Sequence, residues 1–184
     1  MTASVAPAGV EPIRAFVNTC DRERGTEELA SPAALGAWLA GRGLLDQDAA
    51  VTRAELRRAI ELREALRAVL VAHAGRELDA AAPAVLERAA RRARLEVRFD
   101  AGARARPEPL APGVDGALGR LLALVAAAQE DGTWPRLKAC VADDCRWAFY
   151  DRSRNRSAVW CDMGVCGNRE KVRAYRERAS ARRT

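Results

Sequence analysis

The chain has 184 residues, 49% of them hydrophobic and only 5% aromatic, with a formal net charge of +6. This length suits one domain, or a core domain with a small appendage. Forty residues are alanine, which favours helices over a β-sandwich, and no apolar run reaches the roughly 18 residues of a membrane span. The N-terminus lacks the features of a secretory signal, so we expect a cytoplasmic protein with no membrane partner.

Helix signals dominate the first 130 residues. Ser31 followed by Pro32 predicts a short helix that ends before Gly41. Thr52 with Glu55 three residues later predicts a capping box that opens a long amphipathic helix. A further helix is predicted to begin at Pro83.

A small β-hairpin is predicted next. The stretch Leu95-Glu-Val-Arg-Phe99 alternates apolar and polar residues, and Asp100-Ala-Gly102 supplies a turn, so the second strand returns through residues 103–110. After Pro112, apolar residues at helical spacing from Val114 to Gln129 predict another helix. The fold class is therefore mainly α with a small β-hairpin.

The last 51 residues differ in composition from the rest of the chain. They hold 13 basic and 6 acidic residues and four of the five cysteines. The pair Asp131-Gly132, which is typical of a helix end, precedes this change. We therefore predict a mostly helical domain over residues 1–132 and a small basic module over residues 133–184.

Four cysteines form two symmetric pairs, Cys140-x4-Cys145 and Cys161-x4-Cys166, with fifteen residues between the pairs. Short pairs let two thiolates from one turn reach a single ion, and an all-thiolate, closed tetrahedral site favours structural Zn²⁺. Paired spacing in a cytoplasmic chain makes a metal site the better interpretation than two disulfides or buried apolar cysteines. Cys20 is interpreted as a small buried apolar residue rather than a fifth ligand.

The residues around these cysteines resemble the CGNR-type zinc finger. The motifs are Cys140-Val-Ala-Asp-Asp-Cys145, Phe149-Tyr-Asp151, Trp160-Cys161 and Cys166-Gly-Asn-Arg169. The N-terminal half resembles the ABATE-like domain that precedes this finger, in Phe16-Val-Asn-Thr19 and in Ser31-Pro32 leading to Trp38-Leu39. The resemblance implies a bacterial, stress-linked transcriptional regulator whose zinc-finger module, ending in a helix, touches DNA. Relatives carry basic residues just before Trp-Cys, where this chain has Ala158-Val159.

Seven basic residues are candidates for nucleic-acid contacts, since arginine suits bidentate contacts to phosphate and guanine. They are Arg152, Arg154, Arg156, Arg169, Lys171, Arg173 and Arg176. An extended segment would put the first three on one side. A helix after Gly167 would align Arg169, Arg173 and Arg176 beside an apolar seam of Val172, Tyr175 and Ala179. A merely solvated basic face is the alternative, because this chain uses arginine almost wherever others use lysine.

Other polar and aromatic residues receive structural interpretations. Asn168 is expected to cap the terminal helix or to donate to a thiolate sulfur. His73, on the apolar face of its helix, is expected to be a hydrogen-bonded core residue. The carboxylates of Asp143-Asp144 are expected to offset local positive charge. The module's aromatic residues, Trp147, Phe149 and Tyr150, are expected to form its core rather than to stack on bases.

The sequence thus predicts a zinc-containing transcriptional regulator that binds DNA through its Arg-rich finger. A zinc-stapled protein-interaction or RNA-binding module without a specific DNA site is the alternative. An enzyme is not expected, because the sequence offers no nucleophile with a partner base and no open metal site. A small-molecule effector of the N-terminal domain and a homodimer both stay open.

Overall fold

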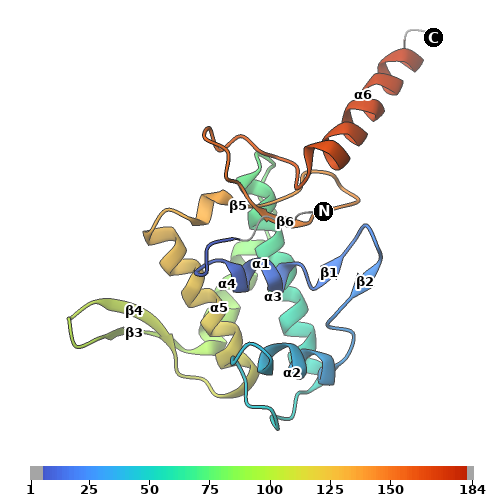
Figure 1. The fold of residues 1–184 in the computed structure, drawn as a ribbon. Coiled ribbons are helices and arrows are strands. Elements are labelled where there is room, and N and C mark those ends of the chain that lie inside the picture. The colour runs from blue at the N-terminus through green and yellow to red at the C-terminus, as the bar shows by residue number, and fades with distance from the viewer. Residues whose placement is uncertain (1–5, 182–184) are drawn as a thin grey trace.

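The computed structural model describes residues 6–181, and the fold is mainly helical with small antiparallel strand pairs, as predicted. Helices α1 to α5 gather into a body, the β3–β4 hairpin projects from one side of it, and α6 stands out at one end (Figure 1). The helices are α1 (Glu11–Val17), α2 (Pro32–Ala40), α3 (Arg53–His73), α4 (Ala82–Ala93), α5 (Gly113–Glu130) and α6 (Asn168–Ala181). No helix in the described range is long and apolar enough to cross a bilayer.

The strands form three two-stranded antiparallel sheets. The pairs are β1 (Cys20–Asp21) with β2 (Thr26–Glu27), β3 (Leu95–Phe99) with β4 (Ala105–Pro109), and β5 (Leu137–Ala139) with β6 (Ala148–Tyr150). A 3-10 turn, η1 (Trp134–Arg136), leads into β5, and a π-helical turn, η2 (Met163–Gly167), leads into α6. The predicted hairpin is therefore confirmed, and two shorter strand pairs accompany it.

Local signals fix where the helices begin. The Ser31 hydroxyl accepts a hydrogen bond from the Ala34 amide at 3.1 Å at the start of α2. At the start of α3, Thr52 accepts from the Glu55 amide at 3.2 Å, and the Glu55 carboxylate accepts from the Thr52 amide at 2.7 Å. Both predicted caps are thus confirmed, because they depend only on residues within one turn.

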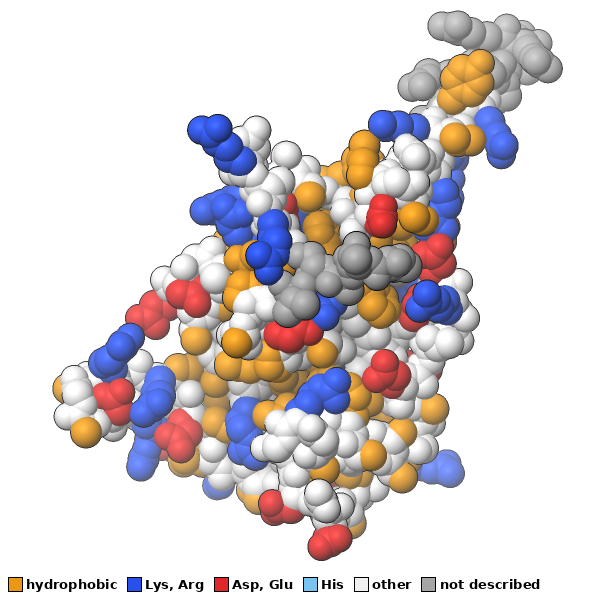
Figure 2. All heavy atoms as spheres, in the orientation of Figure 1, with side chains coloured by type: hydrophobic (Ala, Val, Ile, Leu, Met, Phe, Trp, Pro, Cys, Tyr) orange, Lys and Arg blue, Asp and Glu red, His pale blue; other side chains and the backbone are white. Residues whose placement is uncertain are grey.

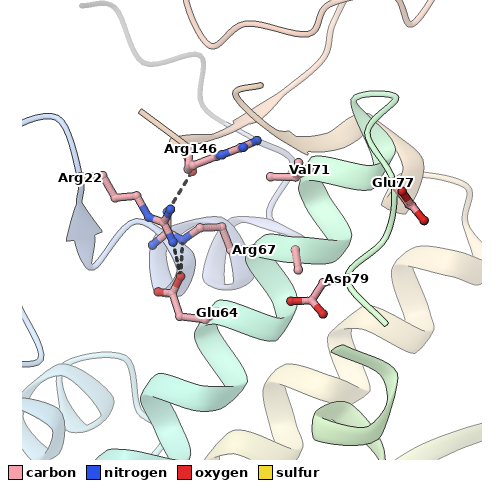
Figure 3. A pocket seen from close by; sticks show the side chains of 8 residues that line it. Arg22, Glu64, Arg67, Val71, Glu77, Asp79 and Arg146 are labelled. Carbon is pink, nitrogen blue, oxygen red and sulfur yellow. Dashed lines mark hydrogen bonds and ion pairs between the residues drawn. The ribbon is translucent and has the colours of Figure 1, made fainter. Parts of the chain in front are cut away.

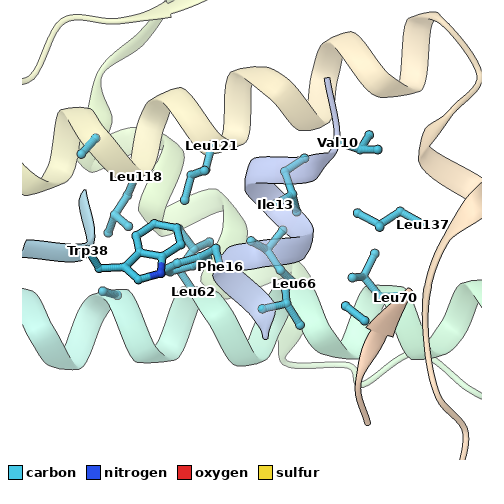
Figure 4. Close-up of a cluster of buried hydrophobic side chains, with 14 of the residues drawn as sticks. Val10, Ile13, Phe16, Trp38, Leu62, Leu66, Leu70, Leu118, Leu121 and Leu137 are labelled. Carbon is cyan, nitrogen blue, oxygen red and sulfur yellow. The ribbon is translucent and has the colours of Figure 1, made fainter. Parts of the chain in front are cut away.

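The core lies between α1, α2, α3 and α5 (Figure 4). Phe16 of α1 packs against Trp38 of α2, with ring centroids 5.4 Å apart, and Leu62 and Leu66 of α3 are fully buried beside them. The fully buried Leu137 of β5 belongs to the same core, as do Ala139 and Ala148 of the β5–β6 pair. The core therefore continues past the turn at Asp131-Gly132, where Gly132 has a φ of 75°.

A close approach anchors the β3–β4 hairpin to the body. A Cβ atom on Gly119 of α5 would lie 2.5 Å from the Cβ of Ala93 and 2.7 Å from the Cβ of Pro109. Only glycine lets the base of the hairpin lie so near α5. The outer part of the hairpin has no such support and extends away from the helices (Figure 1).

Candidate metal centre

The four paired cysteines come together in one cluster. Their sulfur atoms all lie within 4.8 Å of one another. The Sγ of Cys161 lies 3.6 Å from that of Cys145 and 3.7 Å from that of Cys166. A tetrahedron of thiolates with Zn–S bonds of about 2.3 Å has sulfur–sulfur edges of about 3.8 Å, whereas a disulfide needs about 2.05 Å. The donor set therefore fits a metal ion such as Zn²⁺, and the five cysteines are free thiols.

Two short turns present these sulfur atoms. In the first turn, which joins β5 to β6, the Cys145 amide donates to the Ala142 carbonyl at 3.1 Å, and Arg146 has a φ of 55°. In the second, the Cys166 amide donates to the Asp162 carbonyl at 3.0 Å, just before α6 begins. A backbone hydrogen bond of 3.0 Å from Val141 to Val159 holds the two segments together.

The cysteines influence one another's ionisation. Hydrogen bonds from Cys145 and then Cys161 lower the pKa of the Cys140 thiol to about 2. The hydrogen bond with Cys140 raises the pKa of Cys145 to about 12. Cys140 therefore gives up its proton readily while Cys145 holds its own, because thiolates this close repel one another. A divalent cation removes that repulsion, so metal binding is coupled to proton release.

Hydrogen-bond donors surround the cluster. Arg169 Nη2 donates to the Cys166 sulfur at 3.2 Å. Two further buried donors, Arg169 Nε and Trp160 Nε1, have no hydrogen-bond partner among the described residues, and the Trp160 ring packs against the cysteines. Four thiolates with one divalent cation carry two negative charges, which such donors stabilise. The surroundings therefore also fit an occupied tetrathiolate centre.

Arg169 and Asn168 differ from expectation. The Arg169 guanidinium lies 2.9 Å from a Glu23 carboxylate oxygen and 3.7 Å from an Asp144 one, in addition to its contact with the Cys166 sulfur. Its guanidinium therefore contacts the metal centre, although 38% of the side chain stays exposed, and its predicted contact with nucleic acid stays a prediction. The Asn168 amide donates to the Gly164 carbonyl at 3.0 Å, and the expected contact to a thiolate is made by Arg169 instead.

The segment that carries Arg152, Arg154 and Arg156 is folded back rather than extended, so the prediction of a period-two comb is wrong. The Arg156 amide donates to the Ser153 carbonyl at 3.3 Å, and Arg156 has a φ of 51°. The physical reason is the buried ion pair of Lys138 and Asp151, whose Nζ and Oδ2 atoms lie 2.7 Å apart. Lys138 Nζ also donates to the carbonyls of residues 156 and 158, at 2.6 and 3.0 Å, and so pulls the loop inward.

The remaining basic candidates are exposed on two segments, the loop after β6 and helix α6. Figure 2 shows Lys and Arg side chains over both segments, at the same end of the molecule. The exposed residues are Arg152, Arg154, Arg156, Lys171, Arg173 and Arg176. On α6, Arg173 and Arg176 line a hollow of about 630 Å³ together with Val172. The predicted apolar seam is exposed, since Tyr175 keeps 69% of its surface, and the Ala179 side chain lies outside the described residues.

Cys20 is half-buried rather than buried as predicted, whereas the interpretation of the carboxylates agrees with the structure. Asp143 pairs with Arg146, and Asp144 lies near Arg169, so these carboxylates offset positive charge. Trp147 packs against the cysteines and Tyr150 against the main core, while Phe149 is half-buried. Trp147 therefore packs within the module, and Tyr150 packs where the module meets the main core.

Polar side chains of the helical body contact the backbone in and around β5 and β6. Asn18 donates to the Ala148 carbonyl at 2.9 Å and accepts from the Ala148 amide at 2.7 Å, as a partner strand would. Arg67 Nη1 donates to the Arg146 carbonyl at 2.9 Å, beside a hollow of about 260 Å³ (Figure 3). His73 Nδ1 lies 2.9 Å from the Leu137 carbonyl oxygen. These contacts give Asn18 and His73 specific structural roles, which the sequence alone did not define.

We expect the burial of His73 to make the free energy of unfolding depend on pH. Burial lowers the pKa of His73 below 6.5, opposed by its hydrogen bond to Leu137. At pH values between the pKa of His73 in the folded chain and its higher pKa in the unfolded chain, only the unfolded chain binds the proton. The free energy of unfolding therefore falls as pH drops below about 6.5. The slope approaches about 1.4 kcal/mol per pH unit.

Urea unfolding of the metal-loaded protein at several pH values measures this effect. His73→Asn, which keeps a donor near the Leu137 carbonyl, is the control because it removes the titration. The difference in unfolding free energy between the two proteins isolates His73 from protonation of the cysteines. An identical pH dependence for both proteins contradicts the assignment.

Sequence reasoning missed that four charged residues are buried: Arg63, Arg67, Lys138 and Asp151. Each is at most 3% exposed, and their partners lie in segments that no local pattern connects. One signal was available for Lys138. The chain contains only two lysines, and a lysine retained among arginines suits a site that needs a compact point charge.

The fold and the site define a class: a helical domain joined through a shared core to a four-cysteine metal centre that ends in a basic helix. Two family comparisons agree with this description. The CGNR zinc finger family matches residues 136–179, and the ABATE family, described as "Putative stress-induced transcription regulator", matches residues 11–131. The chain belongs to the ABATE family and carries a CGNR zinc finger. No curated protein matches its sequence.

Proposed function

We propose that the protein is a transcriptional regulator that binds duplex DNA through its C-terminal module, folded around Zn²⁺. One observation carries the proposal: exposed basic side chains occupy the two segments that adjoin the cysteine cluster, at one end of the molecule. The loop of residues 151–158 leads into Cys161, and α6 follows Cys166 directly. Holding the cysteines together therefore also fixes both basic segments.

Zinc serves structure in this proposal. Bound Zn²⁺ would neutralise part of the thiolate charge and close the tetrahedron formed by Cys140, Cys145, Cys161 and Cys166. These four ligands leave no position for a substrate, so the residues around the metal act by binding and orienting. Arg169 links the Cys166 sulfur to Glu23 of the β1–β2 turn. The start of α6 is thereby fixed to the N-terminal domain as well as to the metal.

The shape of α6 suits a nucleic-acid groove. The helix has 14 residues, which gives a length of about 21 Å and a diameter of about 10–12 Å, close to the ~12 Å width of the DNA major groove. A helix of this length is marginally stable alone in water. It extends away from the body (Figure 1), so contacts with DNA would stabilise it further.

The double variant Arg154→Ala/Arg176→Ala tests the proposal. Both arginines are exposed, and among the described residues neither forms an ion pair. We expect weaker binding to a mixed-sequence duplex, with the slope of log affinity against log salt reduced by about 2, because each lost phosphate contact removes roughly 0.9. Fluorescence anisotropy of the zinc-loaded protein at several salt concentrations measures both quantities.

The matched control is Arg57→Ala/Arg92→Ala, which removes the same charge from exposed positions on α3 and α4. An equal loss in the control means that only the net charge matters and that the surface is misassigned. No binding at low salt, with one zinc per chain, rejects DNA binding. Preference for single-stranded RNA supports the RNA-binding alternative instead.

A further inference from the structure

The outer half of the β3–β4 hairpin exposes apolar side chains. Leu95, Val97 and Phe99 share one face of β3, since alternate residues point to the same side. Val97 is 64% exposed and Phe99 is 70% exposed. A lone two-stranded ribbon is only marginally stable in water, and exposed apolar groups on it indicate a surface that a partner covers.

The two outer edges of the hairpin differ in what they can bind. Proline has no amide hydrogen, so Pro107 and Pro109 block the outer edge of β4. On the other strand, the Asp100 amide donates to the Arg104 carbonyl at 3.1 Å. Because bonded and non-bonded pairs alternate along an antiparallel ladder, Val97, which pairs with Pro107, directs its amide and carbonyl outward. The edge of β3 is therefore open for a further strand.

The charges on this hairpin form like-charged rows. Glu96 lies directly opposite Glu108, and Arg98 lies directly opposite Arg106. Such pairs destabilise a hairpin slightly. Among the described residues, Glu96, Arg98 and Glu108 form no ion pair. Residues 95–109 hold three acidic and three basic side chains, and this neutrality argues against nucleic acid as the partner.

We propose that β3 pairs with β3 of a second copy of this chain, antiparallel, about a two-fold axis at Val97. In this register Glu96 lies opposite Arg98 of the second copy, and Arg98 lies opposite its Glu96. Leu95 lies opposite Phe99 of the second copy, so the apolar face becomes continuous. The result is a four-stranded sheet with the proline-blocked β4 strands at its two edges.

The strand sequence Leu95-Glu-Val-Arg-Phe99 is complementary to itself under this rotation, which an isologous interface requires. The Val97 residues of the two copies form a hydrogen-bonded pair across the axis. Glu96 and Arg98 fall at non-hydrogen-bonded positions, where opposing side chains approach most closely. Unlike charges at these positions stabilise the sheet. The homodimer is independent of the proposed DNA binding and is tested without nucleic acid.

Sedimentation equilibrium of the zinc-loaded protein tests the proposal with two charge reversals. Glu96→Arg and Arg98→Glu each convert two attractive contacts across the axis into repulsive ones. Each should raise the dimer dissociation constant about ten- to hundredfold. Within one chain, Glu96→Arg places a positive charge opposite Glu108, and Arg98→Glu places a negative charge opposite Arg106. Neither change therefore weakens the hairpin. An equimolar mixture of the two variants should form a heterodimer, because unlike charges then face each other.

Glu108→Arg is the matched control. It makes the same charge change at the position opposite Glu96 but lies on β4, and the dimer should persist. A wild-type chain that remains monomeric overturns the proposal. So does a dimer that survives Glu96→Arg and Arg98→Glu, since it must use another surface. Failure of the two variants to associate when mixed also rejects the register.

Discussion

Replacing Cys161 by serine is expected to abolish metal binding and to unfold the segment from Cys140 to Gly167, while the helices α1 to α5 persist. A hydroxyl is a poor substitute for a soft thiolate, and three sulfur ligands leave the tetrahedron incomplete. Structural zinc contributes about 10–16 kcal/mol in small finger peptides, which exceeds what this segment can gain from its few buried residues. Metal content should fall from one ion per chain to none.

Elemental analysis of the purified variant measures the metal, and hydrogen exchange locates the loss of structure. Cys20→Ser is the control, since Cys20 lies in β1, outside the four-cysteine cluster. It should retain one metal ion per chain and full protection of residues 140–167. Full metal content in Cys161→Ser would falsify the four-ligand assignment.

Replacing Arg67 by methionine is expected to lower the free energy of unfolding by about 3–5 kcal/mol, because buried carbonyl groups lose a charged hydrogen-bond donor. The Arg67 side chain is 2% exposed. It donates to the Val17 carbonyl at 2.7 Å and to the Arg146 carbonyl at 2.9 Å. Methionine fills a similar volume without restoring these bonds. Glu64 loses its contact with Arg67 but keeps Arg22 as a partner.

Urea unfolding of the zinc-loaded protein measures the change. Arg57→Met, at an exposed position of the same helix, should alter stability by no more than about 0.5 kcal/mol. Hydrogen exchange should also show increased opening of the turn that contains Arg146, since Arg67 holds its carbonyl. An Arg67→Met variant that unfolds at the same urea concentration as the wild type contradicts this role.

Features fixed by neighbouring residues could be predicted from the sequence. The caps at Ser31 and Thr52 need only the next turn of helix, and the hairpin at Leu95–Phe99 needs only alternation followed by a turn. The four-cysteine cluster is also predictable, because the spacing within each pair already brings two sulfur atoms onto one turn. Tertiary contacts then determine only how the Cys140–Cys145 pair is positioned relative to the Cys161–Cys166 pair.

The conformation of the 151–158 loop and the orientation of Arg169 could not be predicted in this way. An alternation of Arg with Ser and Asn suits an extended strand. The ammonium group of Lys138, which lies on β5, instead donates to two carbonyls of the loop and folds the loop back. Arg169 lies at the correct helical spacing for a basic face. Its orientation is set instead by a sulfur and by Glu23, which lies 146 positions earlier in the chain.

The pair of hydrogen bonds between Asn18 and Ala148 means that the zinc finger cannot be joined to a different N-terminal domain without loss of contacts. Asn18 acts as a one-residue strand against β6, and Leu137 of β5 completes the helical core. A finger transplanted onto an unrelated domain would lose both supports and expose Leu137 to water. The finger therefore depends on the helical body for part of its stability, and a substitution at Asn18 should weaken the attachment of β6 to α1.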